Sequence, residues 1–112
     1  QSKFANLNSK MQGPIISWKD EVMKGNFMPA IYLLNSGKIN VNDVVCLNTN
    51  NRILHFAATF SYLNVCRCLV EIFKADINLQ NNSGHSSLHI IANNTTKDIY
   101  LLAFALSIES VN

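Results

Sequence analysis

Two histidines, His85 and His89, have the spacing best suited to metal binding in this chain of 112 residues. Residues four apart share one face of a helix, so the two imidazoles could hold a single zinc ion. A zinc site needs three or four ligands, and no third candidate stands near them in the sequence. We therefore predict no metal site and interpret the pair as structural.

The three cysteines, Cys46, Cys66 and Cys68, are an odd number, which excludes a complete set of disulfides within the chain. Cys66 and Cys68 are two residues apart, and on a helix they would point to different faces and could not share a ligand. We interpret all three as reduced packing residues, as is usual in the cytoplasm or nucleus.

The sequence contains no recognisable catalytic motif. It has no Gly-rich phosphate loop and no HExxH, and no Ser, Thr or Cys has a base at the spacing of a known nucleophile motif. The seven acidic residues are scattered along the chain, as on solvated helix faces and in turns. We predict that these residues form no active site and bind no cofactor.

The composition limits the remaining functions. With 48% hydrophobic and 14% charged residues, the chain can bury a core as one domain. A net charge of +2 gives no basic patch for nucleic acid, and no apolar run approaches the ~20 residues needed for insertion across a membrane. The start, Gln1-Ser2-Lys3, is unlike a signal peptide, so we expect a cytoplasmic or nuclear slice of a larger protein.

The strongest pattern is an internal repeat. The dipeptides Leu54-His55 and Leu88-His89 lie 34 residues apart. Self-similarity at such a period indicates stacked units, each of which buries its apolar face only against its neighbours. The apolar residues behind the first dipeptide also recur 34 positions later, as Val65 and Ile99, Leu69 and Ala103, and Val70 and Phe104.

Residues 52–58 and 84–92 resemble the T-P-L-H-x-A signature that opens each ankyrin repeat. The resemblance implies an all-α fold, an ankyrin-repeat solenoid of stacked helix–turn–helix pairs with short finger turns. It also implies that the histidine of each Leu-His pair is structural and locks its turn by bonding to neighbouring main chain and to a nearby hydroxyl. Ser86 supplies that hydroxyl in the later copy, whereas Arg52 stands in its place in the earlier one.

The resemblance covers most of the chain. Residues 1–14 are expected to form an N-terminal extension or capping segment, and residues 15–112 the ankyrin repeat domain. The expected repeats are at about 15–47, 48–81 and 82–112. The expected helix pairs are 18–27 (with its glycine turn) and 30–34, 52–60 and 63–73, and 86–93 and 97–106.

Two local features distinguish the connections between these helices. Lys74 stands where the family has a glycine, and one extra residue before it accounts for the period of 34. Matching Asn40 with Asn78 places four extra residues in the first finger, around 41–47. The apolar run 44–47 could pack beneath this finger or present an edge to a partner, and we favour packing.

The resemblance implies a protein–protein interaction module, a scaffold or adaptor that binds a protein or peptide through its concave helix face and its fingers. The alternative is a regulatory or substrate-recruiting domain of an enzyme whose catalytic part lies outside this chain. Self-association through the apolar C-terminal helix is a further option. The family's variable positions give as candidate contact residues Met23, Lys24, Asn51, Thr59, Phe60, Asn82, Ser83, His85, Asn93 and Asn94.

Phe60 is open to two interpretations. An exposed aromatic on the concave face is typical of a binding hot spot. In that case Phe60→Asp should abolish partner binding and leave folding intact. Alternatively, the ring packs against Phe56 or Tyr62 as part of the core.

Overall fold

The computed structural model describes residues 17–93, 100, 103–104 and 106–107. This part of the chain is mostly helical and carries one small antiparallel sheet of two strands. Its elements in chain order are helices α2 (Trp18–Lys24) and α3 (Met28–Asn35), strands β1 (Val44–Cys46) and β2 (Asn51–Arg52), helices α4 (Ile53–Thr59) and α5 (Leu63–Arg67), the π-helix η1 (Cys68–Ile72) and helix α6 (Ser87–Asn93).

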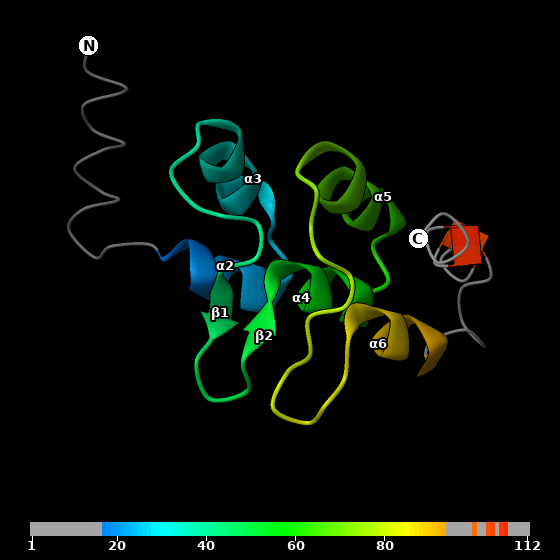
Figure 1. The fold of residues 1–112 in the computed structure, drawn as a ribbon. Helices are drawn as coiled ribbons and strands as arrows, with labels where there is room; N and C mark the ends of the chain where they lie inside the picture. Colours follow the sequence, from blue (N-terminus) through cyan, green and yellow to red (C-terminus); the bar gives the residue numbers. More distant parts are fainter. Residues whose placement is uncertain (1–16, 94–99, 101–102, 105, 108–112) are drawn as a thin grey trace, which may run out of the picture.

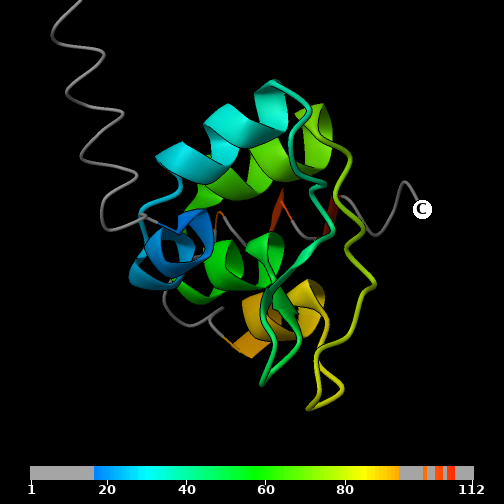
Figure 2. The same cartoon turned by 90° about the vertical axis from the view of Figure 1, so that its left-hand side faces the viewer.

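The helices lie in two rows (Figure 1). Helices α2, α4 and α6 form one row, in which α4 contacts both neighbours, and α3 and α5 lie above it, each packed on the helix before it. Two loops run past the first row and extend beyond it on the side away from α3 and α5. We call residues 40–52 the first finger and residues 76–86 the second finger. The view turned by 90° shows the two fingers side by side (Figure 2).

The core is continuous through both rows, and α4 is its centre. Five of the seven residues of α4 are buried, so this helix must be covered on nearly every side. Ala57 and Ala58 are fully buried, and their small side chains let the neighbouring helices approach closely. Ala92, which corresponds to Ala58 in the later copy of the repeat, is exposed and so does not contribute to this close packing. The bases of the fingers add buried apolar side chains to this core, namely Val41, Val45 and Ile77.

The turn that follows α2 recurs after α4. Its left-handed position is occupied by Gly25 (φ 96°) in the first case and by Ser61 (φ 60°) in the second. Glycine adopts this conformation freely, whereas serine adopts it at a cost. The two turns close with matching pairs of main-chain hydrogen bonds, Gly25 to Val22 (3.0 Å) and Asn26 to Glu21 (2.8 Å), then Ser61 to Ala58 (3.0 Å) and Tyr62 to Ala57 (3.1 Å).

The helix expected at 63–73 is divided into α5 and the π-helix η1. The N–H of Phe73 donates to the carbonyl of Cys68, five positions back, at 3.3 Å. A π turn absorbs one extra residue inside a helix, so the insertion inferred from the period of 34 lies here. The main-chain hydrogen bonds that close the second helix of each pair differ in span by the same one residue. The N–H of Lys38 donates to the carbonyl of Leu33, five positions back, and the N–H of Ala75 donates to the carbonyl of Leu69, six positions back, both at 2.9 Å.

Asn40 and Asp76 open the two fingers with the same turn. The Oδ1 atom of Asn40 accepts a hydrogen bond from the N–H of Asn42 at 2.8 Å, and Oδ1 of Asp76 accepts one from the N–H of Asn78 at 2.9 Å. Asn78 therefore corresponds to Asn42, and our matching of Asn78 with Asn40 is wrong. The sequence offered an asparagine at both positions, and only the side-chain hydrogen bond distinguishes them.

The first finger is longer than the second by two residues, not four. Each finger has a left-handed residue near its end, Asn50 (φ 63°) in the first and Gly84 (φ 77°) in the second. Asn50 lies eight positions after Asn42, and Gly84 lies six after Asn78. The extra length closes as the β1–β2 hairpin, which the all-α expectation did not include.

The apolar run 44–47 is divided between core and solvent. Val45 is 4% exposed and packs beneath the first finger, which confirms the expected packing for this residue. Leu47 is 80% exposed at the turn after β1, so the same expectation is wrong there. The chain turns back after β1, so Leu47 lies beyond the core.

The remaining expectations concern the two ends of the chain. The segment 1–14 and Asn94 lie outside the described residues. Of the helix expected at 97–106, Tyr100 and Leu106 are exposed and Phe104 packs against the core. Among the described residues, no helix combines the length and apolar character needed to cross a membrane.

Candidate interaction surface

The two fingers are joined by hydrogen bonds from base to tip. At the tip, Asn82 donates twice to the first finger, from its N–H to the carbonyl of Thr49 (2.8 Å) and from Nδ2 to the carbonyl of Asn48 (2.9 Å). At the base, the N–H of Asp76 donates to Oδ1 of Asn42 at 2.9 Å. The fingers are therefore fixed in register with each other.

Two further contacts join the fingers between base and tip. The Nδ2 atom of Asn81 donates to Oδ1 of Asn51 at 2.8 Å, and Nη1 of Arg52 donates to the carbonyl of Gln80 at 3.1 Å. Asn51 and Asn82, both candidate contact residues, thus use their amides to hold the fingers together. What they can offer a partner is the remaining amide atoms.

His55 fastens the second finger to α4. Its side chain is buried, Nδ1 accepts a hydrogen bond from the N–H of Arg52 at 2.9 Å, and Nε2 lies 3.1 Å from the carbonyl oxygen of His85. A main-chain N–H can only donate, so Nδ1 is unprotonated and the neutral ring carries its proton on Nε2. The structural role expected of His55 is confirmed, and the main-chain N–H of Arg52 serves where no hydroxyl is present.

The surroundings of His55 favour its neutral form. Burial lowers the pKa of its imidazole below the ordinary value, and the nearby charge of Arg52 lowers it further. The main-chain groups of His85 and Leu79 partly offset these effects.

His89 makes the same cap on α6 but in solvent. Its Nδ1 accepts a hydrogen bond from the N–H of Ser86 at 3.1 Å and lies 2.9 Å from the Oγ of Ser86. The hydroxyl contact expected for this histidine is confirmed. Its ring is exposed, whereas that of His55 is buried.

The hydrogen bonds of His89 also bear on metal binding. The rings of His85 and His89 lie 5.9 Å apart. Because Nδ1 of His89 accepts from a main-chain N–H, the neutral ring carries its proton on Nε2 and has no free lone pair for a metal. In the described part of the chain, no three His, Cys, Asp or Glu side chains gather as a metal site.

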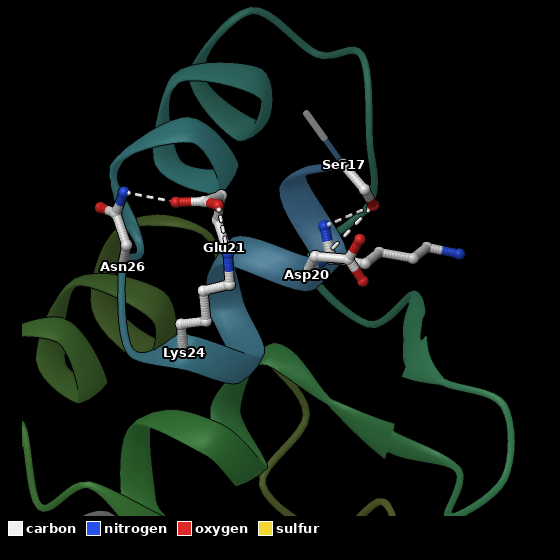
Figure 3. Close-up of polar contacts among 6 residues, drawn as sticks. Ser17, Asp20, Glu21, Lys24 and Asn26 are labelled. Atoms are coloured by element: carbon white, nitrogen blue, oxygen red, sulfur yellow. Dashed lines mark hydrogen bonds and ion pairs between the residues drawn. The ribbon is translucent and has the colours of Figure 1, made fainter. Parts of the chain in front are cut away.

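Helix α2 carries the candidates Met23 and Lys24, both exposed. The Oγ of Ser17 caps this helix by accepting from the N–H groups of Lys19 (3.2 Å) and Asp20 (3.4 Å), as Figure 3 shows. Glu21 accepts from Nδ2 of Asn26 at 2.9 Å and from Nζ of Lys24 at 3.4 Å (Figure 3). Such an exposed ion pair contributes little stability, so Lys24 can exchange it for another carboxylate.

Phe60 belongs to a cluster of three aromatic rings. It stacks on Tyr62 with centroids 5.6 Å apart and meets Phe27 edge to face at 6.3 Å. The second interpretation of this residue is therefore correct, with Tyr62 as the packing partner. Because Phe27 lies between α2 and α3, the cluster joins the first helix pair to the second, and the expectation that Phe60→Asp leaves folding intact no longer holds.

The candidate contact residues fall into two groups, one at the N-terminal and one at the C-terminal ends of the helices in the row α2, α4 and α6. A helix of seven residues is about 10 Å long, which separates the groups. The group in the fingers, at the N-terminal ends of α4 and α6, is Asn51, Asn82, Ser83 and His85. The group at or next to the C-terminal ends of α2, α4 and α6 is Met23, Lys24, Thr59, Phe60 and Asn93.

Two features of the first finger are not among the candidate contact residues, although exposure of the run 44–47 was weighed as an alternative. Leu47 is the most exposed large apolar side chain among the described residues. Beside it, the hydroxyl and the main-chain N–H of Thr49 bond to the thiol of Cys46 and lower its pKa. The apolar run was a signal for Leu47, but nothing in the sequence identified the partner of Cys46.

No protein-family model matches the chain, and no curated protein is significantly similar to it. Its function must therefore be inferred from its own residues and their geometry.

Proposed function

We propose that this chain is a protein-binding module of the ankyrin-repeat type, a scaffold or adaptor that holds a protein or peptide against its fingers and the row α2, α4 and α6. The Leu-His pairs 34 residues apart support this proposal. So do the matching turns at Gly25 and Ser61 and the matching histidine caps on α4 and α6. Units of this kind stack into a solenoid because each buries its apolar face against the next.

The observation that carries the proposal is the hydrogen-bonded pair of fingers. Asn82, Asn81 and Arg52 fix the fingers in register without any contribution from a bound molecule. A surface ordered before binding loses little conformational entropy when a partner docks. Exposed side chains that these bonds leave at the tips, among them Leu47 and Ser83, are then available for contact.

We place the module in the cytoplasm or nucleus. Cys46, Cys66 and Cys68 are free thiols, as in proteins of reducing compartments.

Affinity capture with matched surface variants tests the proposal. Leu47→Asp with Ser83→Arg changes exposed positions on the fingers, and Met28→Asp with Asn64→Arg makes the same change of charge on α3 and α5. We expect proteins captured by the unchanged chain to be lost with the finger variant and kept with the other, both variants being equally stable. If captured proteins were lost only with the variant on α3 and α5, binding would lie on the row formed by those two helices, and the proposal would be wrong.

A further inference from the structure

The junction at His55 joins three parts of the fold through one imidazole. The ring belongs to α4, its Nδ1 accepts from the N–H of Arg52 at the end of the first finger, and its Nε2 faces the carbonyl of His85 at the end of the second. Only 1% of this residue is exposed. We call His55 with these two main-chain groups the His55 junction.

A second proton cannot be added to this ring without breaking the junction. It would go to Nδ1, where the N–H of Arg52 already donates, so two donors would face each other across 2.9 Å. The new positive charge would also be buried, and a buried charge without a counter-ion is strongly unfavourable.

The charged groups on the elements packed around α4 offer no compensation. Arg52 is the nearest charge and repels a protonated ring. The thiol of Cys66 lies fully buried in the same core. The other titratable side chains on α2, α5 and α6 are engaged elsewhere or exposed: Lys19 lies over Trp18, Glu21 pairs with Lys24, Arg67 pairs with Glu71, Asp20 is exposed, and His89 bonds to Ser86 in solvent. On the fingers, Asp43 and Asp76 accept from the N–H groups of Asn40 and Asn78 at the finger bases, and His85 is exposed.

We propose that the His55 junction is a pH-sensitive latch, which holds Arg52, at the end of the first finger, against the start of α4 while the imidazole is neutral and releases it on protonation. The released segment is the end of the first finger, because the added proton takes the lone pair of Nδ1 to which the N–H of Arg52 donates, whereas Nε2–H can still donate to the carbonyl of His85. This inference concerns the fold alone and does not depend on the proposed binding of a partner.

The low pKa of His55 sets the direction of the effect. Since the folded state holds this pKa below the unfolded value, the stabilisation is complete above the unfolded pKa and is lost as pH falls below it through the folded pKa. Each unit by which folding lowers the pKa corresponds to about a tenfold change in the opening equilibrium.

Hydrogen exchange of the full chain at pH 7.5 and 5.5 tests the latch. After correction for the intrinsic pH dependence of exchange, we expect the amide of Arg52 to lose protection by up to about tenfold at the lower pH. The amides of α2 and α3 should keep theirs. An equal loss of protection everywhere would overturn the proposal, because it would mean global unfolding.

Two glutamine variants distinguish the contribution of His55 from that of His89. Glutamine at the third helical position can accept from the N-cap N–H and cannot be protonated, so His55→Gln should keep the amide of Arg52 protected at pH 5.5. His89→Gln should behave as the unchanged chain. The proposal fails if His55→Gln loses protection as the unchanged chain does. If that variant does not fold, the NMR titration of His55 in the unchanged chain decides: His55 must titrate below the ordinary pKa of an imidazole, and the amide of Arg52 must shift with it.

Discussion

Lys74 holds, at the end of the second helix pair, the backbone position that Gly37 holds at the end of the first. Both residues have positive φ, 62° for Lys74 and 74° for Gly37. Side chains with a Cβ adopt this left-handed conformation at a cost of about 1–2 kcal/mol. Lys74 is exposed and no described contact of its side chain compensates for this cost.

Lys74→Gly should therefore stabilise the fold. Relief of the backbone strain exceeds the greater flexibility of glycine in the unfolded chain, so we expect a gain of about 0.5–1 kcal/mol in the free energy of unfolding. Chemical denaturation measures it through the midpoint. Lys74→Ala is the matched control, because it removes the side chain and keeps the strain. A similar gain in both variants would assign the effect to the lysine side chain.

Phe60→Ala should destabilise the fold by about 1–3 kcal/mol, because it removes one ring from the cluster with Tyr62 and Phe27. Thermal denaturation measures the loss. Tyr32→Ala, at an exposed aromatic on α3, should change stability by less than about 0.5 kcal/mol. Equal effects of the two substitutions would contradict the packing described for Phe60.

Asn51 and Asn81 should be energetically coupled across the fingers. In a double-mutant cycle with alanine at each position, we expect a coupling of about 0.5–1.5 kcal/mol from their shared hydrogen bond. Asn81→Ala should cost more than Asn51→Ala, since Oδ1 of Asn81 also accepts from the N–H groups of Ser83 and His85. Additive losses in the double variant would show that the fingers are not linked through these amides.

Cys46 should be the most reactive of the three thiols. The bonds from Thr49 lower the pKa of Cys46, whereas burial raises that of Cys68, so at a given pH near neutrality Cys46 has the larger thiolate fraction. Cys66 is fully buried and should react last. Alkylation with iodoacetamide, followed by mass spectrometry of the peptides, gives the order. Thr49→Val should slow the reaction of Cys46 and leave that of Cys68 unchanged.

The sequence predicted helices better than the connections between them. The helices at 52–60 and 86–93 are confirmed to within one residue at each end, because the Leu-His pairs and the apolar spacing mark them unambiguously. The β1–β2 hairpin was not predicted, since its strands have three and two residues and no alternating pattern can develop over that length. The insertion before Lys74 was counted correctly, but the period alone could not place it in a π turn.

The candidate surface was predicted less completely than the fold. Positions such as Asn51 and Asn82 were identified as variable, but their hydrogen bonds to the neighbouring finger depend on which residues lie opposite them. The packing of Phe60 likewise depends on Phe27, 33 positions earlier in the chain. Contacts of this kind follow from the tertiary arrangement and leave no local mark in the sequence.

The tips of both fingers are free of ionisable acids and bases apart from one thiol. Residues 44–51 and 77–84 contain no Asp, Glu, Lys, Arg or His. A molecule that contacts these segments alone meets no charged side chain within them, so its shape has more weight than its charge in deciding whether an encounter is productive. Association at this surface should then proceed at nearly the same rate in dilute buffer and in concentrated salt, and discrimination between ligands should appear in how long each one stays.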